Sequence, residues 1–261
     1  VKMCALLGIA GPAVGCAGGE KLSEPGAPGV VAGGADAGGA GGADTTVIIV
    51  GAGAAGMSAG YLLAERGVDF VILEAGPVHG GRIRRADDFV DFPIPLGGEW
   101  LHDDPEVLVD IVGDDVDVEL VAYRPDDPYG FYDGAALTLG PLGATTDRKF
   151  VGATWLDFFD TYVVPGIADA MVFDTAVVGI DHGSDSVVVT DADGRDHVGD
   201  AVIVTVPLTI LRDGDIAFVP ELPTAKREAL AAADVWGGIK VFLEFSERFY
   251  PTFLEFPDSD T

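Results

Sequence analysis

Cysteine is scarce in this chain. Among its 261 residues there are two cysteines, Cys4 and Cys16, and both precede Ala17. The rest of the chain can therefore form no disulfide, no thiolate metal site and no cysteine nucleophile. It also offers no cysteine for covalent attachment of a cofactor.

Basic residues are few as well, with 15 Lys and Arg against 43 Asp and Glu, which gives a formal net charge of −28. Such a chain repels phosphate backbones, which excludes nucleic acid as a partner. The acidic residues are spread along the chain singly and in pairs such as Asp87-Asp88. We interpret them as a solvated acidic surface, with adaptation to high salt as the alternative.

The sequence shows no Ser-His-Asp arrangement and no cluster of metal ligands, so no metal site is predicted. It is 48% hydrophobic and long enough for one large or two small domains. Because apolar residues are plentiful, a sizeable core is expected.

Long hydrophobic runs are absent, and the first 16 residues hold a short one, "VKMCALLGIAGPAVGC". It is too short to cross a bilayer as a helix and fits the apolar part of a secretory leader. "AVGC" resembles a bacterial lipoprotein cleavage box, which would make Cys16 a lipid attachment site and the protein exported and membrane-anchored. A cytoplasmic protein is the alternative. The Gly- and Ala-rich residues 17–45 are predicted to be a flexible linker.

A β-α-β unit is predicted where the linker ends. The run "VIIV" at 47–50 is typical of a buried parallel strand, and 54–66 is predicted to be a helix that ends at Gly67. A second buried strand is predicted over 69–74.

Downstream, strands and helices continue to interleave, which indicates the α/β class. Helices are expected over 103–113, 154–172 with an interruption at Pro165, and 222–234, and strands over 186–194, 200–207 and 239–245.

The turn between the first strand and helix carries the spacing G-x-G-x-x-G. Gly51 permits the tight turn, Gly53 allows a pyrophosphate to approach the backbone, and Gly56 allows helix and strand to pack closely. Glu74 ends the second strand, where its carboxylate can accept hydrogen bonds from ribose hydroxyls and disfavours a 2′-phosphate. The dinucleotide is thus NAD or FAD, unless this is a glycine turn that binds nothing. The loop residues predicted to contact it, where the helix N-terminus faces the phosphates, are Gly51, Gly53, Ala54, Ala55 and Gly56.

The residues that follow favour FAD. "EAGPVHGGRI" resembles the E-A-x-x-x-x-G-G-R signature of the flavin-containing amine oxidase family, which includes monoamine and polyamine oxidases. The resemblance implies that Glu74, Ala75, Gly80, Gly81 and Arg82 lie along a non-covalently bound FAD. Arg82 supplies a fixed cation for the pyrophosphate.

A further segment, "PLGGEWLH" at 95–102, resembles the family's L-G-x-x-W segment, whose backbone runs beside the flavin ring. The resemblance assigns cofactor contacts to Gly97, Gly98, Glu99 and Trp100. His102 falls where some polyamine oxidases carry a substrate-facing residue, although a surface histidine beside two aspartates is the alternative. His79, inside the second glycine loop, receives no role.

Two more segments match the family in the right order. Residues 173–211 resemble its return to the FAD domain, in which Val177 would pair its backbone with the adenine. Lys240 matches the family lysine that holds a water near flavin N5; otherwise it is an ordinary strand lysine.

These matches imply an α/β fold: a Rossmann-like FAD-binding domain with an inserted, incomplete α+β substrate domain. The expected divisions are a leader at 1–16, a linker at 17–45, the first part of the FAD domain at 46–135, a shortened substrate-domain insertion at 136–172, the return of the FAD domain at 173–212 and the start of the substrate domain at 213–261.

The implied activity is oxidation of an amine C–N bond to an imine, with O2 reduced to H2O2. The expected partners are a small-molecule amine and O2, and the candidate catalytic residues are Lys240 and His102. Two alternatives remain: an FAD-dependent desaturase or oxidase of the isoprenoid or porphyrin type, and a truncated FAD-binding domain without activity. The family continues beyond the segment matched by 239–245, so we expect this chain to be a fragment of a longer protein.

Overall fold

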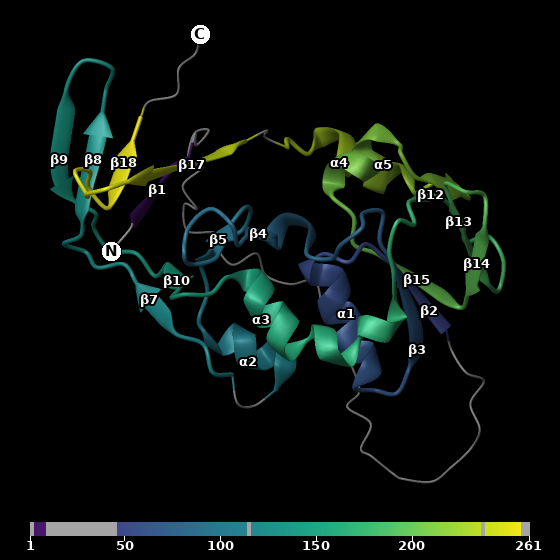
Figure 1. The fold of residues 1–261 in the computed structure, drawn as a ribbon. Coiled ribbons are helices and arrows are strands. Elements are labelled where there is room, and N and C mark those ends of the chain that lie inside the picture. Colours follow the sequence, from purple (N-terminus) through teal and green to yellow (C-terminus); the bar gives the residue numbers. More distant parts are fainter. Residues whose placement is uncertain (1–2, 9–45, 114–115, 236–237, 257–261) are drawn as a thin grey trace, which may run out of the picture.

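The computed structural model describes residues 3–8, 46–113, 116–235 and 238–256, and Figure 1 shows their arrangement. One half of the molecule holds a four-stranded parallel sheet in the order β11-β3-β2-β15. Its strands are β2 (Thr46–Val50), β3 (Asp69–Leu73), β11 (Met171–Val172) and β15 (Ala201–Val204). The predicted first strand thus lies at the centre of a parallel sheet.

Helix α1 (Ala54–Ala64) connects β2 to β3, as the β-α-β prediction requires. It ends as predicted at Gly67, which has a left-handed φ of +64°. The Gly67 N–H donates to the Ala64 carbonyl and the Val68 N–H to the Leu63 carbonyl. These two hydrogen bonds form a Schellman motif, which satisfies carbonyls that the helix leaves free.

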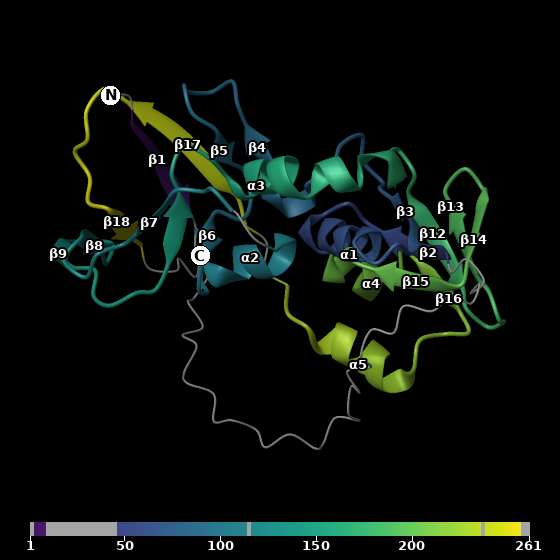
Figure 2. The same ribbon diagram turned by 90° about the horizontal axis from the view of Figure 1, so that it is seen from below.

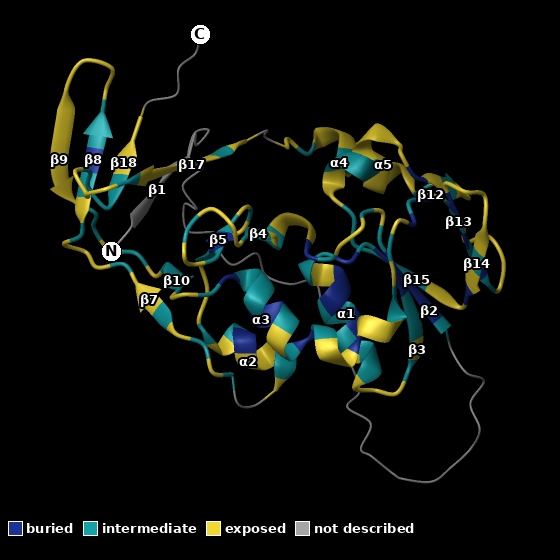
Figure 3. Ribbon diagram, in the orientation of Figure 1, coloured by how far each residue is buried: buried dark blue, intermediate teal, exposed yellow. Residues whose placement is uncertain are grey.

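The parallel sheet is buried on both faces. Val47 and Ile49 of β2 pack on the side of α1, while Ile48 and Val50 pack on the opposite side. A second sheet covers that opposite side, in the order β14-β13-β12-β16. Its strands are β12 (Val177–Asp181), β13 (Val187–Asp191), β14 (Asp196–Gly199) and β16 (Ala217–Val219). Helices, parallel sheet and second sheet therefore form three layers around two apolar clusters, as Figure 3 shows by burial.

On the helical side, α2 (Glu106–Val112) and α3 (Trp155–Tyr162) join α1. Leu108 and Phe158 contribute one side chain each to the shared cluster, and both are 1% exposed. The predicted helix over 154–172 is wrong at its end. After Tyr162 the chain makes two 3-10 turns, Val164–Gly166 and Ala168–Ala170, and then the edge strand β11. Pro165 cannot continue an α-helix, and the free edge of β3 supplies partners for an extended chain.

Helices α4 (Leu208–Asp213) and α5 (Thr224–Ala232) flank β16.

The other half of the molecule is built from small sheets (Figures 1 and 2). One is β6 (Trp100–Leu101), β10 (Arg148–Phe150) and β7 (Leu120–Ala122). Another is β18 (Phe253–Glu255), β8 (Pro128–Tyr132) and β9 (Leu137–Pro141). Two pairs complete this half: β4 (Arg85–Ala86) with β5 (Ile94–Pro95), and β1 (Met3–Gly8) with β17 (Lys240–Phe245). A 3-10 turn also spans Gly81–Ile83.

Strand β1 lies within the predicted leader, and it pairs antiparallel with β17 so that Gly8 is opposite Lys240. Cys16 and the linker at 17–45 lie outside the described residues. The predicted domain boundary after residue 135 falls in the turn of the β8–β9 hairpin. Within the described part of the chain, no helix is both long and apolar enough to span a bilayer.

Candidate functional site

The first glycine loop, residues 51–56, lies at the carboxyl ends of β2 and β3. Gly51 adopts a φ of +102°, and its N–H donates to the Leu73 carbonyl at 2.8 Å. A Cβ on Gly56 would lie 1.9 Å from the Gly51 carbonyl oxygen, whereas a Cβ on Gly53 would meet nothing within 4 Å. Gly56 is therefore required by packing, while Gly53 leaves open space above the loop. This is the difference of role that the motif predicts.

The start of helix α1 faces that open space. Gly53 is the N-cap, no side chain caps the helix, and its first turn contains no acid. Ala54 and Ala55 therefore present backbone N–H groups, at the positive end of the helix dipole, without a side-chain acceptor. An anion such as a pyrophosphate fits this position.

Glu74 stands immediately after β3 and binds the same loop. Its Oε2 accepts the Ala52 N–H at 2.7 Å, and its Oε1 accepts the Gly76 N–H at 2.9 Å. The carboxylate thereby holds the first glycine loop to the segment that begins at the exposed Ala75. Each oxygen keeps acceptor capacity, so ribose hydroxyls can still bind there.

The second glycine loop, residues 79–82, packs directly on the first. Gly80 and Gly81 have φ of +102° and +48°, and the Gly80 N–H donates to the Ala52 carbonyl at 2.8 Å. A Cβ on Gly81 would lie 3.4 Å from the Gly53 Cα. Arg82 is exposed, and no described acid pairs with its side chain. Its guanidinium is therefore available to an anionic ligand.

The 97–100 segment joins these loops through Arg82. The Gly98 N–H donates to the Arg82 carbonyl at 2.8 Å, and a Cβ on Gly97 would lie 1.7 Å from the same oxygen. Three glycine segments that are far apart in the sequence thus meet at one edge of the parallel sheet. Indole Nε1 of Trp155 donates to the Trp100 carbonyl at 3.1 Å, which ties the segment to α3.

Val177 is 9% exposed and begins β12. It is brought to the nucleotide end of the sheet because the Thr175 N–H donates to the Glu74 carbonyl at 2.8 Å. The side chain packs in the core, and the residue pairs with Asp191 of β13. The adenine contact of the Val177 backbone stays a prediction.

Lys240 contacts a carboxylate of the 97–100 segment. Its Nζ lies 2.5 Å from Oε2 of Glu99, whose other oxygen forms an ion pair with Lys149. Glu99 is 6% exposed. Burial raises the pKa of Glu99, but hydrogen bonds from the two ammonium groups outweigh it and hold the pKa below its ordinary value. Burial lowers the pKa of Lys149, and contact with Glu99 more than reverses this, so the net shift is upward.

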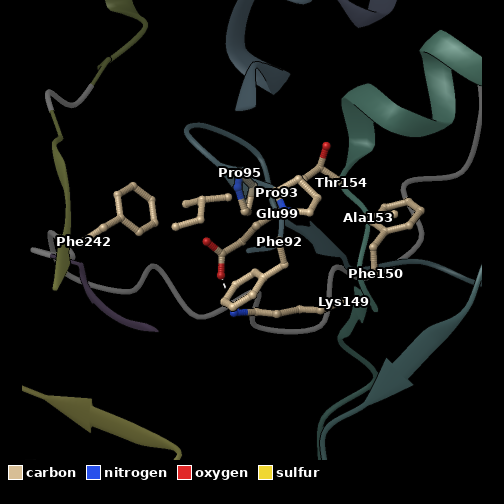
Figure 4. Close-up of a pocket in the computed structure, with 11 residues that line it drawn as sticks. Phe92, Pro93, Pro95, Glu99, Lys149, Phe150, Ala153, Thr154 and Phe242 are labelled. Carbon is tan, nitrogen blue, oxygen red and sulfur yellow. Dashed lines mark ion pairs between the residues drawn. The ribbon is translucent and has the colours of Figure 1, made fainter. Parts of the chain in front are cut away.

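A cavity of about 270 Å³ opens beside this cluster. Figure 4 draws the Glu99 carboxylate between the ring of Phe242 and the ammonium of Lys149. The other lining residues named in Figure 4 are Phe92, Pro93, Pro95, Phe150, Ala153 and Thr154. The cavity thus combines an apolar wall with a buried, ion-paired polar group, which is the usual character of a small-molecule site.

His102 lies at the surface. Its side chain is 72% exposed, and Nδ1 is 2.7 Å from Asp147. The ring stacks on Trp100 at 6.0 Å between centroids, and Trp100 in turn packs against Tyr123 and Phe253. His102 does not line the described cavity, so its substrate-facing role stays a prediction.

Sequence reasoning missed Lys149, His79 and Thr205. Lys149 carries no motif signal, because only the pairing of β10 with β6 and β7 brings it to Glu99. The Thr205 hydroxyl donates to the Val50 carbonyl at 2.8 Å, below the first glycine loop. Its position directly after a buried strand was the one available signal.

Among the described residues no group of three or more His, Cys, Asp or Glu could hold a metal ion.

Comparison with known proteins agrees with this geometry. Residues 167–259 match the family described as flavin containing amine oxidoreductase, and residues 49–113 match the NAD(P)-binding Rossmann-like domain. Polyamine oxidase 3 of Oryza sativa subsp. japonica is 40% identical over 75 residues, which is 29% of this chain and 16% of that protein. Lysine-specific histone demethylase 1B of Mus musculus is 38% identical over 82 residues, 31% of this chain and 10% of that protein.

Among solved structures, putrescine oxidase bound to putrescine superposes with a TM-score of 0.57 at 13% identity. The superposition covers 72% of this chain and 63% of that one, so it speaks for the fold alone. The matched part of the chain spans less than a fifth of each of these two curated relatives. Two family matches follow each other along the chain. Together with the converging glycine loops and the free helix N-terminus, they indicate a flavin-binding site. Over residues 167–259 the chain is similar to the flavin-containing amine oxidoreductase family, and FAD is the cofactor that its nucleotide site fits.

Proposed function

We propose that the protein oxidises the C–N bond of a small amine to an imine and transfers the electrons to O2, releasing H2O2. The observation that supports this proposal is the contact of Lys240 with Glu99, because Lys240 is the residue that resembles the family lysine and Glu99 lies in the segment predicted to run beside the flavin. When bound, the flavin would supply the redox chemistry: it would take a hydride equivalent from the amine, whose nitrogen releases a second proton, and two electrons and two protons would then convert O2 to H2O2.

The chain's own residues have defined tasks in this proposal. The glycine loops and the start of α1 bind the pyrophosphate, and Arg82 balances its charge. Glu74 holds the ribose. Glu99 fixes the Lys240 ammonium, which can then hold a water molecule at a set position. The rings of Phe92, Phe150 and Phe242 give the cavity beside it an apolar wall.

The substrate class follows from relatives that are named polyamine oxidase and putrescine oxidase. We test it by mixing the full-length, FAD-loaded protein with a panel of monoamines, putrescine, spermidine and spermine, and measuring H2O2. Release with at least one amine supports the proposal. Flavin absorbance without turnover of any amine contradicts it and favours a desaturase-type oxidase or a binding domain.

The variant Lys240→Met tests the lysine. We expect a fall of about tenfold or more in peroxide release, because the water loses its donor. Lys226→Met is the matched control, since Lys226 is exposed on α5 and contacts none of the site residues. Equal activity of both variants would contradict a role for Lys240.

We also propose, from the sequence alone, export and lipid attachment at Cys16. Cleavage before Cys16 would remove β1, whereas the structure pairs β1 with β17. The two arrangements exclude each other in the mature protein. The mass of the mature N-terminal peptide decides between them, and an intact N-terminus would overturn the lipid anchor.

A further inference from the structure

His79 lies inside the second glycine loop, directly before Gly80. Its Nε2 is 2.7 Å from Oδ1 of Asp160, on helix α3. Because an ionised carboxylate only accepts hydrogen bonds, the Nε2 atom carries the proton in this contact. The loop is thus bound to a helix 81 residues further along the chain.

Arg85 makes a second connection just after the loop. Its Nη1 lies 2.8 Å from Asp157 and 3.1 Å from Asp160. Asp157 is itself fixed, because it forms a capping box with Thr154 at the start of α3. In Figure 2, α3 runs beside β4, the strand that carries Arg85. The second glycine loop is therefore held to α3 through His79, its first residue, and through Arg85, three residues after its last.

An apolar contact lies between these two polar ones. A Cβ on Gly80 would come within 2.9 Å of Leu156 Cδ1, so the α3 side chain packs directly on the glycine backbone. On its other side the Gly80 N–H is bonded to Ala52 of the first loop. The loop is thus held between α3 and the first glycine loop.

We propose that α3 pre-organises the second glycine loop for FAD, with His79 and Asp160 as positioning residues. Two consecutive glycines are costly to order, since each has a wide choice of backbone conformations in the free chain. Fixing them before the cofactor arrives removes that cost from the binding equilibrium. The inference rests on the proposed function in one respect, namely that FAD occupies this loop.

The test compares His79→Ala, His79→Gln and Asp160→Ala in the full-length protein. The FAD dissociation constant is measured by flavin fluorescence. We expect it to rise about tenfold for His79→Ala and by at least as much for Asp160→Ala, which also removes the contact with Arg85. The double variant should bind FAD no more weakly than Asp160→Ala, because the His79 contact is already lost in that variant. His79→Gln retains an N–H donor and should recover most of the affinity.

A second measurement needs no FAD. Hydrogen exchange of the Gly80 and Ile83 amides, which donate to Ala52 and Gly80, should become faster in His79→Ala. The matched control is His197→Ala. His197 pairs with Asp191 at 3.0 Å in the β13–β14 hairpin and has the same 25% side-chain exposure as His79. It should change neither FAD affinity nor exchange in the loop.

The outcomes separate the two proposals. Wild-type protein that binds no FAD would overturn the proposed function, while loop exchange would still report whether α3 holds the loop. Wild-type protein that binds FAD, with unchanged affinity in His79→Ala and Asp160→Ala, would overturn this inference alone. A loss that His79→Gln does not recover would also contradict it, because the hydrogen bond would then not be the cause.

Discussion

Lys240 and Glu99 are 141 residues apart in the sequence, and their charged atoms lie 2.5 Å apart. Strand β17 supplies the ammonium group, and the segment between β5 and β6 supplies the carboxylate. With Lys149 on β10, the contact connects three separate parts of the chain around one buried acid. The cluster carries two positive charges and one negative, in a chain whose formal net charge is −28.

Glu99→Gln should destabilise the fold by about 2 kcal/mol, because it leaves two ammonium groups without their counter-charge. The loss is smaller than for a fully buried pair, since the side chains of Lys149 and Lys240 are 32% and 23% exposed and can turn to water. Urea unfolding measures it. The control is Glu221→Gln, which removes an exposed acid 3.3 Å from Arg227 and should change stability by less than about 0.5 kcal/mol. Equal losses in the two variants would contradict the special position of Glu99.

The stability difference between wild type and Glu99→Gln should depend on pH in a defined direction. The pKa of Glu99 is lowered from 4.5, so its contribution is present above that value and is lost as the pH falls through the folded-state pKa. The pKa of Lys149 is raised from 10.5, so its contribution is present below that value and is lost as the pH rises through the folded-state pKa. Urea unfolding curves should therefore show a constant difference in the free energy of unfolding between pH 4.5 and pH 10.5. A difference that grows on acidification would contradict the assignment.

Gly53→Ala and Gly56→Ala should separate binding from folding. A Cβ at position 53 meets no protein atom, so we expect stability to change by less than about 1 kcal/mol while FAD affinity falls about tenfold. A Cβ at position 56 overlaps the Gly51 carbonyl, so the helix must move and stability should fall by more than about 2 kcal/mol. Thermal unfolding and FAD titration of both variants provide the check. Full FAD affinity in Gly53→Ala would show that the cofactor does not approach this backbone.

Glu74→Gln should weaken the protein even without FAD. The glutamine oxygen can accept one of the two N–H groups, but its NH2 group then faces the other donor, at a cost of about 1–2 kcal/mol. FAD affinity should also fall, because a ribose contact is lost. Thermal unfolding with and without FAD measures both effects. Glu65→Gln, an exposed position at the end of α1, is the control and should alter neither.

Much of the nucleotide-binding half could be predicted because its signals are local. The run 47–50 predicts a buried strand, the spacing of Gly51, Gly53 and Gly56 predicts the turn, and Gly67 predicts the helix end. Each of these predictions depends on residues that are close together in the sequence. The helix prediction over 154–172 failed at Met171 and Val172, because the partner that makes them a strand is β3, about 100 residues earlier in the chain.

The sequence by itself predicted the α/β class and a dinucleotide site, because the glycine spacing and the acid that ends the second strand are local signals. The resemblance of residues 74–83 to the flavin-containing amine oxidase family then selected FAD. Only the tertiary structure decided which side chains stand beside that site. The ion pair of Glu99 with Lys149 and the hydrogen bond of His79 with Asp160 join residues 50 and 81 positions apart. The energy of these contacts depends on distance and burial, and both are set only when the strands and α3 pack together.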